Sequence, residues 1–362
     1  MLNLPKAMIV FWGLSYAAFG CVSVSPNIIQ DPTLHSSTAF DSAQLIKQNK
    51  IAIQANRFID EHNETFVFKG FNIASPEKLI KDGKWDKAIF AEIKRWGANT
   101  VRLPVHPIGW RRYGEDEYLK LIDQAVVWAN ELDLYLIIDW HSIGYLLNET
   151  FQNPIYETTV EETLRFWQLV ARRYANIPTL AAYEIFNEPT DKHSKTGREN
   201  WAEWKAFNER AIDIIQAFDD QTIILVAGFN WAYELKNAKQ APIERTGVGY
   251  VSHPYPQKER PNPRTKEALF KRWTAAWGIL AEDYPIILTE LGWVAEDGHG
   301  AHIPVIDDGS YGPYIMEYIQ QNGLSWTAWC FDPNWSPTII QDWSYTPTEQ
   351  GEFFKQVLAD QQ

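Results

Sequence analysis

The chain has 362 residues, a hydrophobic fraction of 45% and a formal net charge of −13. The length and the apolar content exclude a disordered chain and any need for a disulfide framework, and the acidic charge argues against a nucleic-acid-binding protein or one that adheres to anionic membranes. The 17 tryptophans are a first indication of function, because a Trp ring offers a flat apolar face to a flat ligand.

The first twenty residues are typical of a secretory signal. Lys6 gives a weakly positive start, and residues 7–20 form an apolar run that is too short to span a membrane. The sequence Ala18-Phe19-Gly20-Cys21 suits cleavage before Cys21, and it also resembles a bacterial lipoprotein box, in which that cysteine is acylated. We therefore expect a signal peptide over residues 1–20 and a protein that is secreted or held at the cell envelope, with Cys21 as the candidate lipid anchor.

Residues 21–48 show little periodicity and are predicted to be a linker, followed by a catalytic domain over residues 49–362. No second apolar run of about 18 residues follows, so we expect no membrane-spanning segment in the mature chain, and we expect a monomer. The second of the two cysteines, Cys330, is predicted to lie in the core. No spacing of Cys and His resembles a zinc site, and we expect neither a metal nor a cofactor.

From residue 50 onward, short β-rich runs alternate with amphipathic helical patterns. Two short runs at 51–53 and 57–60 predict a hairpin. Eight strands are then predicted over residues 65–73, 99–104, 134–139, 180–186, 222–227, 249–252, 285–290 and 324–330. The predicted helices cover residues 85–96, 117–132, 159–174, 200–218, 265–282, 310–322 and 349–358, with only a short helix after the fifth strand.

Strands that alternate with helices pair in parallel through crossover connections. Eight such units in about 300 residues predict a (β/α)8 TIM barrel of the α/β class, as a single catalytic domain with a short N-terminal β-hairpin. The alternative is an open, doubly wound sheet. That fold would need a glycine-rich phosphate loop after an early strand, which the sequence lacks.

Polar and aromatic residues collect at the C-terminal ends of the predicted strands, where a barrel of this class builds its active site. They include Arg102, His106, Asp139, His141, Asn187, Glu188, His253, Tyr255, Glu290, Trp326 and Trp329. Glu188 and Glu290 follow the fourth and seventh strands, so they would lie across the mouth of one barrel. Cleavage of a glycosidic bond needs two such carboxyl groups, one protonated to donate to the leaving oxygen and one ionised to attack the anomeric carbon.

The segment Ala182-Tyr-Glu-Ile-Phe-Asn187-Glu188-Pro189 resembles the signature of glycoside hydrolase family 5, the large cellulase family of the 4/7 superfamily, and the likeness extends over roughly residues 65–345. The resemblance implies that Glu188 is the general acid/base and that Glu290, in Ile-Leu-Thr-Glu-Leu-Gly, is the nucleophile. It also assigns supporting residues: Arg102 to keep the nucleophile ionised, His141 after the third strand, Asn187 to read the sugar 2-hydroxyl, His253 and Tyr255 as the His-x-Tyr pair, and Trp329 as the sugar platform beside the cleaved bond.

The leading hypothesis is a retaining endo-β-1,4-glucanase whose partner is a β-linked polysaccharide or oligosaccharide. The same site acting on β-mannan, xyloglucan or short oligosaccharides is a second hypothesis. A carbohydrate-binding protein on an inactive scaffold is a third, against which the intact pair of Glu188 and Glu290 argues. A metal-dependent barrel enzyme would need more clustered ligands. Further sugar platforms are expected among six tryptophans, for each of which a place in the core is equally open: Trp110, Trp140, Trp231, Trp293, Trp335 and Trp343.

Overall fold

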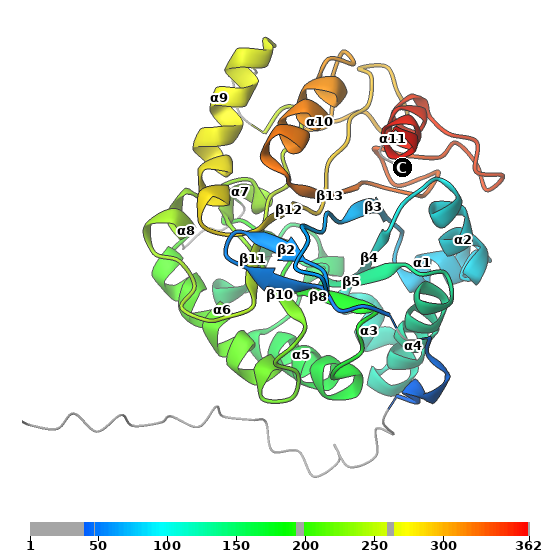
Figure 1. Cartoon of the computed structure of the whole chain (residues 1–362), viewed down its shortest axis with the longest axis vertical. Coiled ribbons are helices and arrows are strands. Elements are labelled where there is room, and N and C mark those ends of the chain that lie inside the picture. Colours follow the sequence, from blue (N-terminus) through cyan, green and yellow to red (C-terminus); the bar gives the residue numbers. More distant parts are fainter. Residues whose placement is uncertain (1–39, 47, 193–198, 259–263, 361–362) are drawn as a thin grey trace, which may run out of the picture.

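A closed barrel of eight parallel strands forms the centre of the molecule (Figure 1). The computed structural model describes residues 40–46, 48–192, 199–258 and 264–360. Around the barrel the strands are β3 (Lys69–Asn72), β4 (Thr100–Val105), β5 (Tyr135–Trp140), β8 (Leu180–Glu184), β10 (Ile223–Ala227), β11 (Val248–Val251), β12 (Ile286–Leu288) and β13 (Ser325–Ala328). Since β13 pairs with β3 and closes the ring, the predicted TIM barrel is confirmed.

Helices follow the strands and cover the outside of the barrel (Figure 1). They are α1 (Pro76–Lys81), α2 (Lys87–Arg95), α3 (Pro107–Tyr113), α4 (Glu115–Glu131), α5 (Val160–Tyr174), α6 (Trp201–Gln216), α7 (Phe229–Ala232), α8 (Lys236–Gln240), α9 (Lys266–Ala276), α10 (Tyr311–Asn322) and α11 (Glu349–Ala359). The sequence pattern does not predict α1 and α3, because helices of 6 and 7 residues are too short to show an amphipathic period. Each begins with proline, whose fixed φ suits a first helical position.

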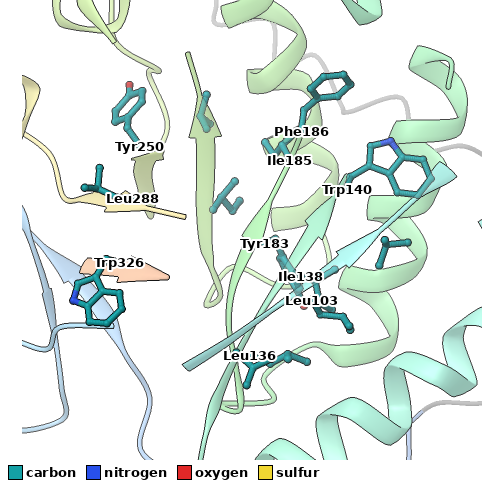
Figure 2. Close-up of a cluster of buried hydrophobic side chains, with 14 of the residues drawn as sticks. Leu103, Leu136, Ile138, Trp140, Tyr183, Ile185, Phe186, Tyr250, Leu288 and Trp326 are labelled. Carbon is teal, nitrogen blue, oxygen red and sulfur yellow. The ribbon is translucent and has the colours of Figure 1, made fainter. Parts of the chain in front are cut away.

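The strands are apolar on both faces, as expected for a parallel sheet covered on both sides. In β4, Val101, Leu103 and Val105 belong to the large cluster beneath the helices, whereas Arg102 makes its hydrogen bonds inside the barrel. Figure 2 shows part of this cluster, with Leu103 next to its strand neighbour Ile138 of β5. The alternation places every second side chain inside the barrel, where the polar ones become available to the site.

A hairpin closes the N-terminal end of the barrel, and we call this end the floor. Strands β1 (Ala52–Gln54) and β2 (Arg57–Ile59) are antiparallel, as predicted, and lie across the middle of the ring of strands (Figure 1). Phe58 packs edge-on against Phe68 and shares a second buried cluster with Tyr135 and Ile223, the first residues of β5 and β10. The interior below the site is therefore filled with apolar side chains.

The described chain begins to pack ahead of the hairpin. The ring of Phe40 lies 5.5 Å from that of Tyr174 at the end of α5, and the backbone nitrogen of Ile46 donates a 2.7 Å hydrogen bond to Asn130 of α4. Part of the predicted linker over residues 21–48 thus lies against the barrel. The predicted signal peptide and Cys21 lie outside the described residues. Cys330 is fully buried, and no helix in the described ranges is long and apolar enough to cross a membrane.

Candidate active site

A cleft of about 580 Å³ opens at the C-terminal ends of the barrel strands. Six of the eight predicted site residues line it, namely His141, Asn187, Glu188, Tyr255, Glu290 and Trp329. The other two, Arg102 and His253, are fully buried and support the carboxylates from behind. The structure therefore brings all eight residues to one place.

Glu290 follows β12, and two donors hold its carboxylate. Nη1 of Arg102 lies 3.0 Å from Oε1, and the hydroxyl of Tyr255 donates a 2.9 Å hydrogen bond to Oε2. Burial raises the pKa of Tyr255 well above its usual value, so its hydroxyl keeps the proton that it donates. A carboxylate with a cation on one oxygen and a neutral donor on the other is held ionised and fixed in direction.

Arg102 is the centre of a buried polar network. Its guanidinium makes two parallel 2.8 Å hydrogen bonds to Glu184, and it also donates to the side-chain oxygens of Asn72 and Asn187. Asp139 lies 3.0 Å from Nη2. Strand pairing creates this arrangement, because Asn72 is in register with Arg102, and Asp139 is in register with Glu184.

The network holds more carboxyl groups than cations. Burial raises the pKa of Asp139 to about 7 and that of Glu184 to about 7, although the charge of Arg102 acts in the opposite direction on both. Burial also lowers the pKa of Arg102, but Asp139, Glu184 and Glu290 outweigh it, and the guanidinium stays charged. Near neutral pH, each of these two buried carboxyl groups therefore keeps a proton for part of the time, whereas carboxyl groups in water would lose it.

Glu188 is held from a different side of the cleft. It lies in β9 (Glu188–Pro189), which pairs with β6 (Ile143–Tyr145) in a small rim sheet completed by β7 (Thr150–Phe151). Its Oε1 lies 3.0 Å from Nδ1 of His253 and 3.5 Å from Nζ of Lys258. Burial holds the pKa of His253 well below the usual range, so this ring is neutral.

When Glu184 is ionised, the partners of His253 favour one of its two tautomers. Thr289 donates its hydroxyl hydrogen to Glu184 at 3.2 Å, so its oxygen is free to accept from Nε2 of His253, 2.9 Å away. In that tautomer Nδ1 is an acceptor, so a hydrogen bond to it from Glu188 uses the acid form of the carboxyl group. The chain from Glu184 to Glu188 thus favours the acid form of Glu188.

The two cleft carboxylates are close but differ in their surroundings. One oxygen of Glu188, one oxygen of Glu290 and one nitrogen of His253 all lie within 4.8 Å of one another. Retaining glycosidases place their two carboxyl groups about 5–5.5 Å apart, whereas inverting ones leave about 6.5–9.5 Å for a water molecule. The 4.8 Å bound applies to one oxygen of each group, and oxygens this close are consistent with the first class.

Asn187 offers an unused donor to the cleft. Its Oδ1 accepts from Arg102 at 2.7 Å, which fixes the orientation of the amide. Its Nδ2 is buried and has no hydrogen-bond partner in the protein. Because a buried donor without a partner is costly, a hydroxyl of a bound ligand is the natural acceptor.

An aromatic wall completes the cleft. Trp329 follows β13 and lies parallel to Trp335, with ring centroids 5.9 Å apart, and parallel to His141 at 5.4 Å. The six further tryptophans divide into two groups. Trp110, Trp140 and Trp293 are buried, whereas Trp231, Trp335 and Trp343 are partly exposed; of these six, Trp231 lines the cleft.

The same cluster is the one group of acidic and histidine side chains in the described residues that is compact enough to hold a metal ion, namely Glu188, His253 and Glu290. Each of these groups already has a protein partner within 3.0 Å: His253 for Glu188, Thr289 for His253, and Tyr255 for Glu290. A test with chelator separates metal chemistry from acid–base chemistry at this site.

Sequence reasoning missed several residues of the site, among them Glu184, Tyr156 and Lys258. Glu184 lies in the signature segment, and a charged residue inside an apolar strand was the available signal. Tyr156 of η4 (Pro154–Tyr156) and Lys258 also line the cleft, but both come from connections without a period or motif. Only the fold brings them to the carboxylates.

A family model described as Cellulase (glycosyl hydrolase family 5) matches residues 59–335. The endoglucanase of Clostridium saccharobutylicum is 24% identical over 77% of this chain and 56% of that enzyme. The endoglucanase of Paenibacillus polymyxa is 21% identical over 89% of this chain and 90% of that enzyme. The chain thus spans a little more than half the length of the Clostridium protein.

The structure of a β-glucanase from Saccharophagus degradans is similar, with 54% identity and a TM-score of 0.88 over 90% of this chain and 97% of that one. The same β-glucanase has been solved in complex with cellotetraose. The catalytic domain of a Thermobifida fusca endoglucanase, 21% identical with a TM-score of 0.67 over 86% of this chain and 97% of that one, shares the fold.

Proposed function

Since the chain belongs to the cellulase family, glycosyl hydrolase family 5, we propose that it is a retaining endo-β-1,4-glucanase, an O-glycosyl hydrolase that acts on a β-1,4-linked glucan. The observation that carries the proposal is the pair of Glu188 and Glu290, which have oxygens within 4.8 Å of each other and surroundings that favour opposite protonation states. The similarity to a β-glucanase solved with cellotetraose supports the same substrate class.

In the first step, Glu290 is the nucleophile. One of its oxygens attacks the anomeric carbon and forms a covalent glycosyl ester, while the bond from that carbon to the leaving oxygen breaks. Arg102 and Tyr255 keep the carboxylate ionised and direct it at the sugar. Glu188 gives its proton to the leaving oxygen, so the departing chain leaves as a neutral alcohol.

In the second step, Glu188 is a base. Its carboxylate takes a proton from water, and the water oxygen attacks the anomeric carbon and displaces Glu290. The two inversions restore the starting configuration. His253 then faces a protonated Glu188 again, which is the state that the hydrogen-bond chain through Thr289 favours.

The rest of the cleft positions the sugar. Trp329 offers its face to the ring next to the cleaved bond, and Asn187 offers its unpaired amide hydrogen atoms to the 2-hydroxyl. A hydrogen bond that strengthens at the 2-hydroxyl as the transition state forms lowers the barrier to cleavage. His141, whose Nδ1 lies 2.6 Å from Asp139, supports this wall.

The test is to follow hydrolysis of carboxymethylcellulose and cello-oligosaccharides by proton NMR. We expect the β-anomer to appear first and the viscosity of the polymer to fall before most reducing ends are released. First appearance of the α-anomer would overturn the retaining mechanism. Assays on mixed-linkage glucan, xyloglucan and β-mannan separate the substrate alternatives, and activity lost with EDTA and restored by a metal ion would favour metal chemistry.

The location and the oligomeric state rest on the sequence alone. We propose that the protein is secreted or held at the cell envelope, with cleavage before Cys21, and that it works as a monomer. Mass spectrometry of the mature protein would distinguish a free N-terminus from an acylated Cys21. Light scattering of the purified protein would measure its mass in solution.

A further inference from the structure

One cleft lysine lies beside Glu188 and has no role in the mechanism above. Lys258 belongs to the connection after β11 that also carries His253 and Tyr255. Its Nζ lies 3.5 Å from Oε1 of Glu188 and donates a 2.8 Å hydrogen bond to the carbonyl oxygen of Trp231. Its side chain is only 5% exposed. Since lysine is rarely buried without partners, these oxygens hold its ammonium group in place.

Two aromatic rings complete the surroundings of the ammonium group. Nζ lies 5.6 Å from the ring centroid of Trp231 and 5.8 Å from that of Tyr255, within the range of cation–π attraction. The Trp231 carbonyl belongs to a turn in which Asn230 and Trp231 have φ values of 57° and 53°. Residues with side chains rarely adopt this left-handed conformation, so the hydrogen bond from Lys258 ties an unusual turn to the acid/base.

We propose, on the basis of the function proposed above, that Lys258 is a positioning residue for Glu188 that stabilises the carboxylate formed each time Glu188 gives up its proton. In the first step, negative charge develops on Glu188 at 3.5 Å from the ammonium group. Opposite charges this close in a buried site attract strongly. His253 has the opposite effect on the same oxygen of Glu188, because its acceptor nitrogen favours the protonated form of the Glu188 carboxyl group.

These opposing neighbours suit a group that must be an acid in one step and a base in the next. Of the lysines and arginines in the described part of the chain, Lys258 is the one with a nitrogen within 4.0 Å of the Glu188 carboxylate. The other titratable groups that face Glu188 or Lys258 are Asp139 of β5, His141 directly after β5, Tyr156 of η4, Lys192 after β9, His253 and Tyr255 after β11, and Glu290 after β12.

The charge state of Lys258 depends on the same carboxylates. Burial lowers the pKa of Lys258 from its ordinary value, while the charges of Glu188 and Glu290 act in the opposite direction. Lys192 provides a matched comparison, because its Nζ lies 4.4 Å from the same Trp231 ring. Removing either lysine takes one positive charge from this side of the cleft, but only Lys258 is in contact with Glu188.

The experiment compares the variants Lys258→Met, Lys258→Gln, Lys258→Arg and Lys192→Met on two aryl β-cellobiosides, one with a 2,4-dinitrophenyl and one with a phenyl leaving group. In Lys258→Met we expect kcat/KM to fall about 10- to 100-fold for the phenyl substrate, which needs acid help, and less than about threefold for the activated one. The basic limb of the pH profile for the phenyl substrate should move up by about one pH unit, because the proton is held more tightly without the ammonium group.

The other variants separate charge from tethering. Lys258→Gln keeps a donor for the Trp231 carbonyl and should show the same shift of the basic limb, even if Lys258→Met does not fold. Lys258→Arg should bring the limb back toward that of the parent enzyme, and Lys192→Met should leave it in place. Folded Met and Gln variants with an unmoved limb and equal losses on both substrates would overturn the role of Lys258 alone. A parent enzyme inactive on both substrates and on β-glucan would instead overturn the proposed function with it.

Discussion

The floor of the barrel and its rim have opposite interiors. At the floor, the rings of Phe58, Phe66, Phe68 and Tyr135 meet edge-to-face with centroids 4.9–5.1 Å apart, and this packing stabilises the fold. At the rim, Arg102 is fully buried among three carboxyl groups. Burying such charges costs free energy that their attraction offsets only in part. The residues that stabilise the fold and those that carry out catalysis therefore lie at opposite ends of the barrel axis. Substitutions at one end can be compared with substitutions at the other.

The largest effect is expected at the rim, from Glu290→Ala. Without its nucleophile the enzyme should lose about 10⁴-fold or more in kcat, with partial rescue by azide and a product of inverted configuration. Because Asp139 and Glu184 still pair with Arg102, the melting temperature should change by only a few degrees. A variant that unfolds, or one that keeps substantial activity without azide, would contradict this assignment.

Glu188→Ala should distinguish the role of Glu188 from that of Glu290. We expect a loss of about 10²–10⁴-fold on β-glucan, because general acid catalysis typically contributes that much. The first step on 2,4-dinitrophenyl β-cellobioside should be largely spared, since that leaving group needs little protonation. The measurement is the pre-steady-state release of dinitrophenol, and equal losses on both substrates would be inconsistent with the division of roles.

At the floor, Phe58→Ala should lower stability and spare catalysis. The ring is 4% exposed, so its removal should reduce the free energy of unfolding by about 3–5 kcal/mol. Urea unfolding measures this loss, and kcat/KM at 25 °C should stay within about twofold of the parent value. Arg57→Ala, at the exposed neighbouring position of β2, is the control and should change stability by less than about 0.5 kcal/mol. A fall in kcat/KM for the Phe58 variant would show that the two ends are coupled.

Trp329→Ala tests whether the rim aromatics serve the sugar or the fold. Trp329 lines the cleft and is 9% exposed. We therefore expect kcat/KM to fall by the equivalent of about 2–4 kcal/mol of transition-state stabilisation, with a small change in melting temperature. A core residue would instead cost about 3–5 kcal/mol of stability. A large drop in melting temperature with unchanged kinetics would place Trp329 with the floor residues.

The smallest effect is the pH dependence of stability that the rim charges impose. The pKa values of Asp139 and Glu184 are raised to about 7 from ordinary values of 3.8 and 4.5. A carboxyl group whose pKa is higher in the folded state than in the unfolded state stabilises the fold. This contribution is complete at a pH below the pKa of the unfolded state, and it is lost as the pH rises through the pKa of the folded state. Between pH 5 and 8 the free energy of unfolding of the parent should therefore fall by on the order of 1–3 kcal/mol more than that of the Glu184→Gln variant. Parallel stability curves for the two proteins would contradict the raised pKa of Glu184.

The fold could be predicted in large part because its signals are local. An apolar strand and an amphipathic helix each show a period within ten to twenty residues, so all eight strands and the predicted hairpin were found. The rim sheet could not be predicted, because β7 and β9 have 2 residues each and their pairing depends on the completed barrel. The helices α1 and α3 could not be predicted either, because they are too short to show an amphipathic period.

The site divides in a similar way. Glu188, Glu290 and their motif partners stand at strand ends, where sequence order and position in space agree. Lys258 reaches Glu188 because the part of the connection after β11 that carries it lines the cleft, and no sequence pattern around it indicates this. The raised pKa values of Asp139 and Glu184 depend on strand register and burial, which are properties of the assembled sheet.

The packing of Phe40 and Ile46 determines the side of the barrel to which a support or a domain joined ahead of Phe40 would be attached. Both residues lie against the C-terminal ends of α5 and α4, at the floor, on the side opposite the cleft. A bead, scaffold or carrier domain attached ahead of Phe40 would therefore support the barrel from below. The cleft would then point outward, so that an insoluble polymer could approach it without obstruction from the support.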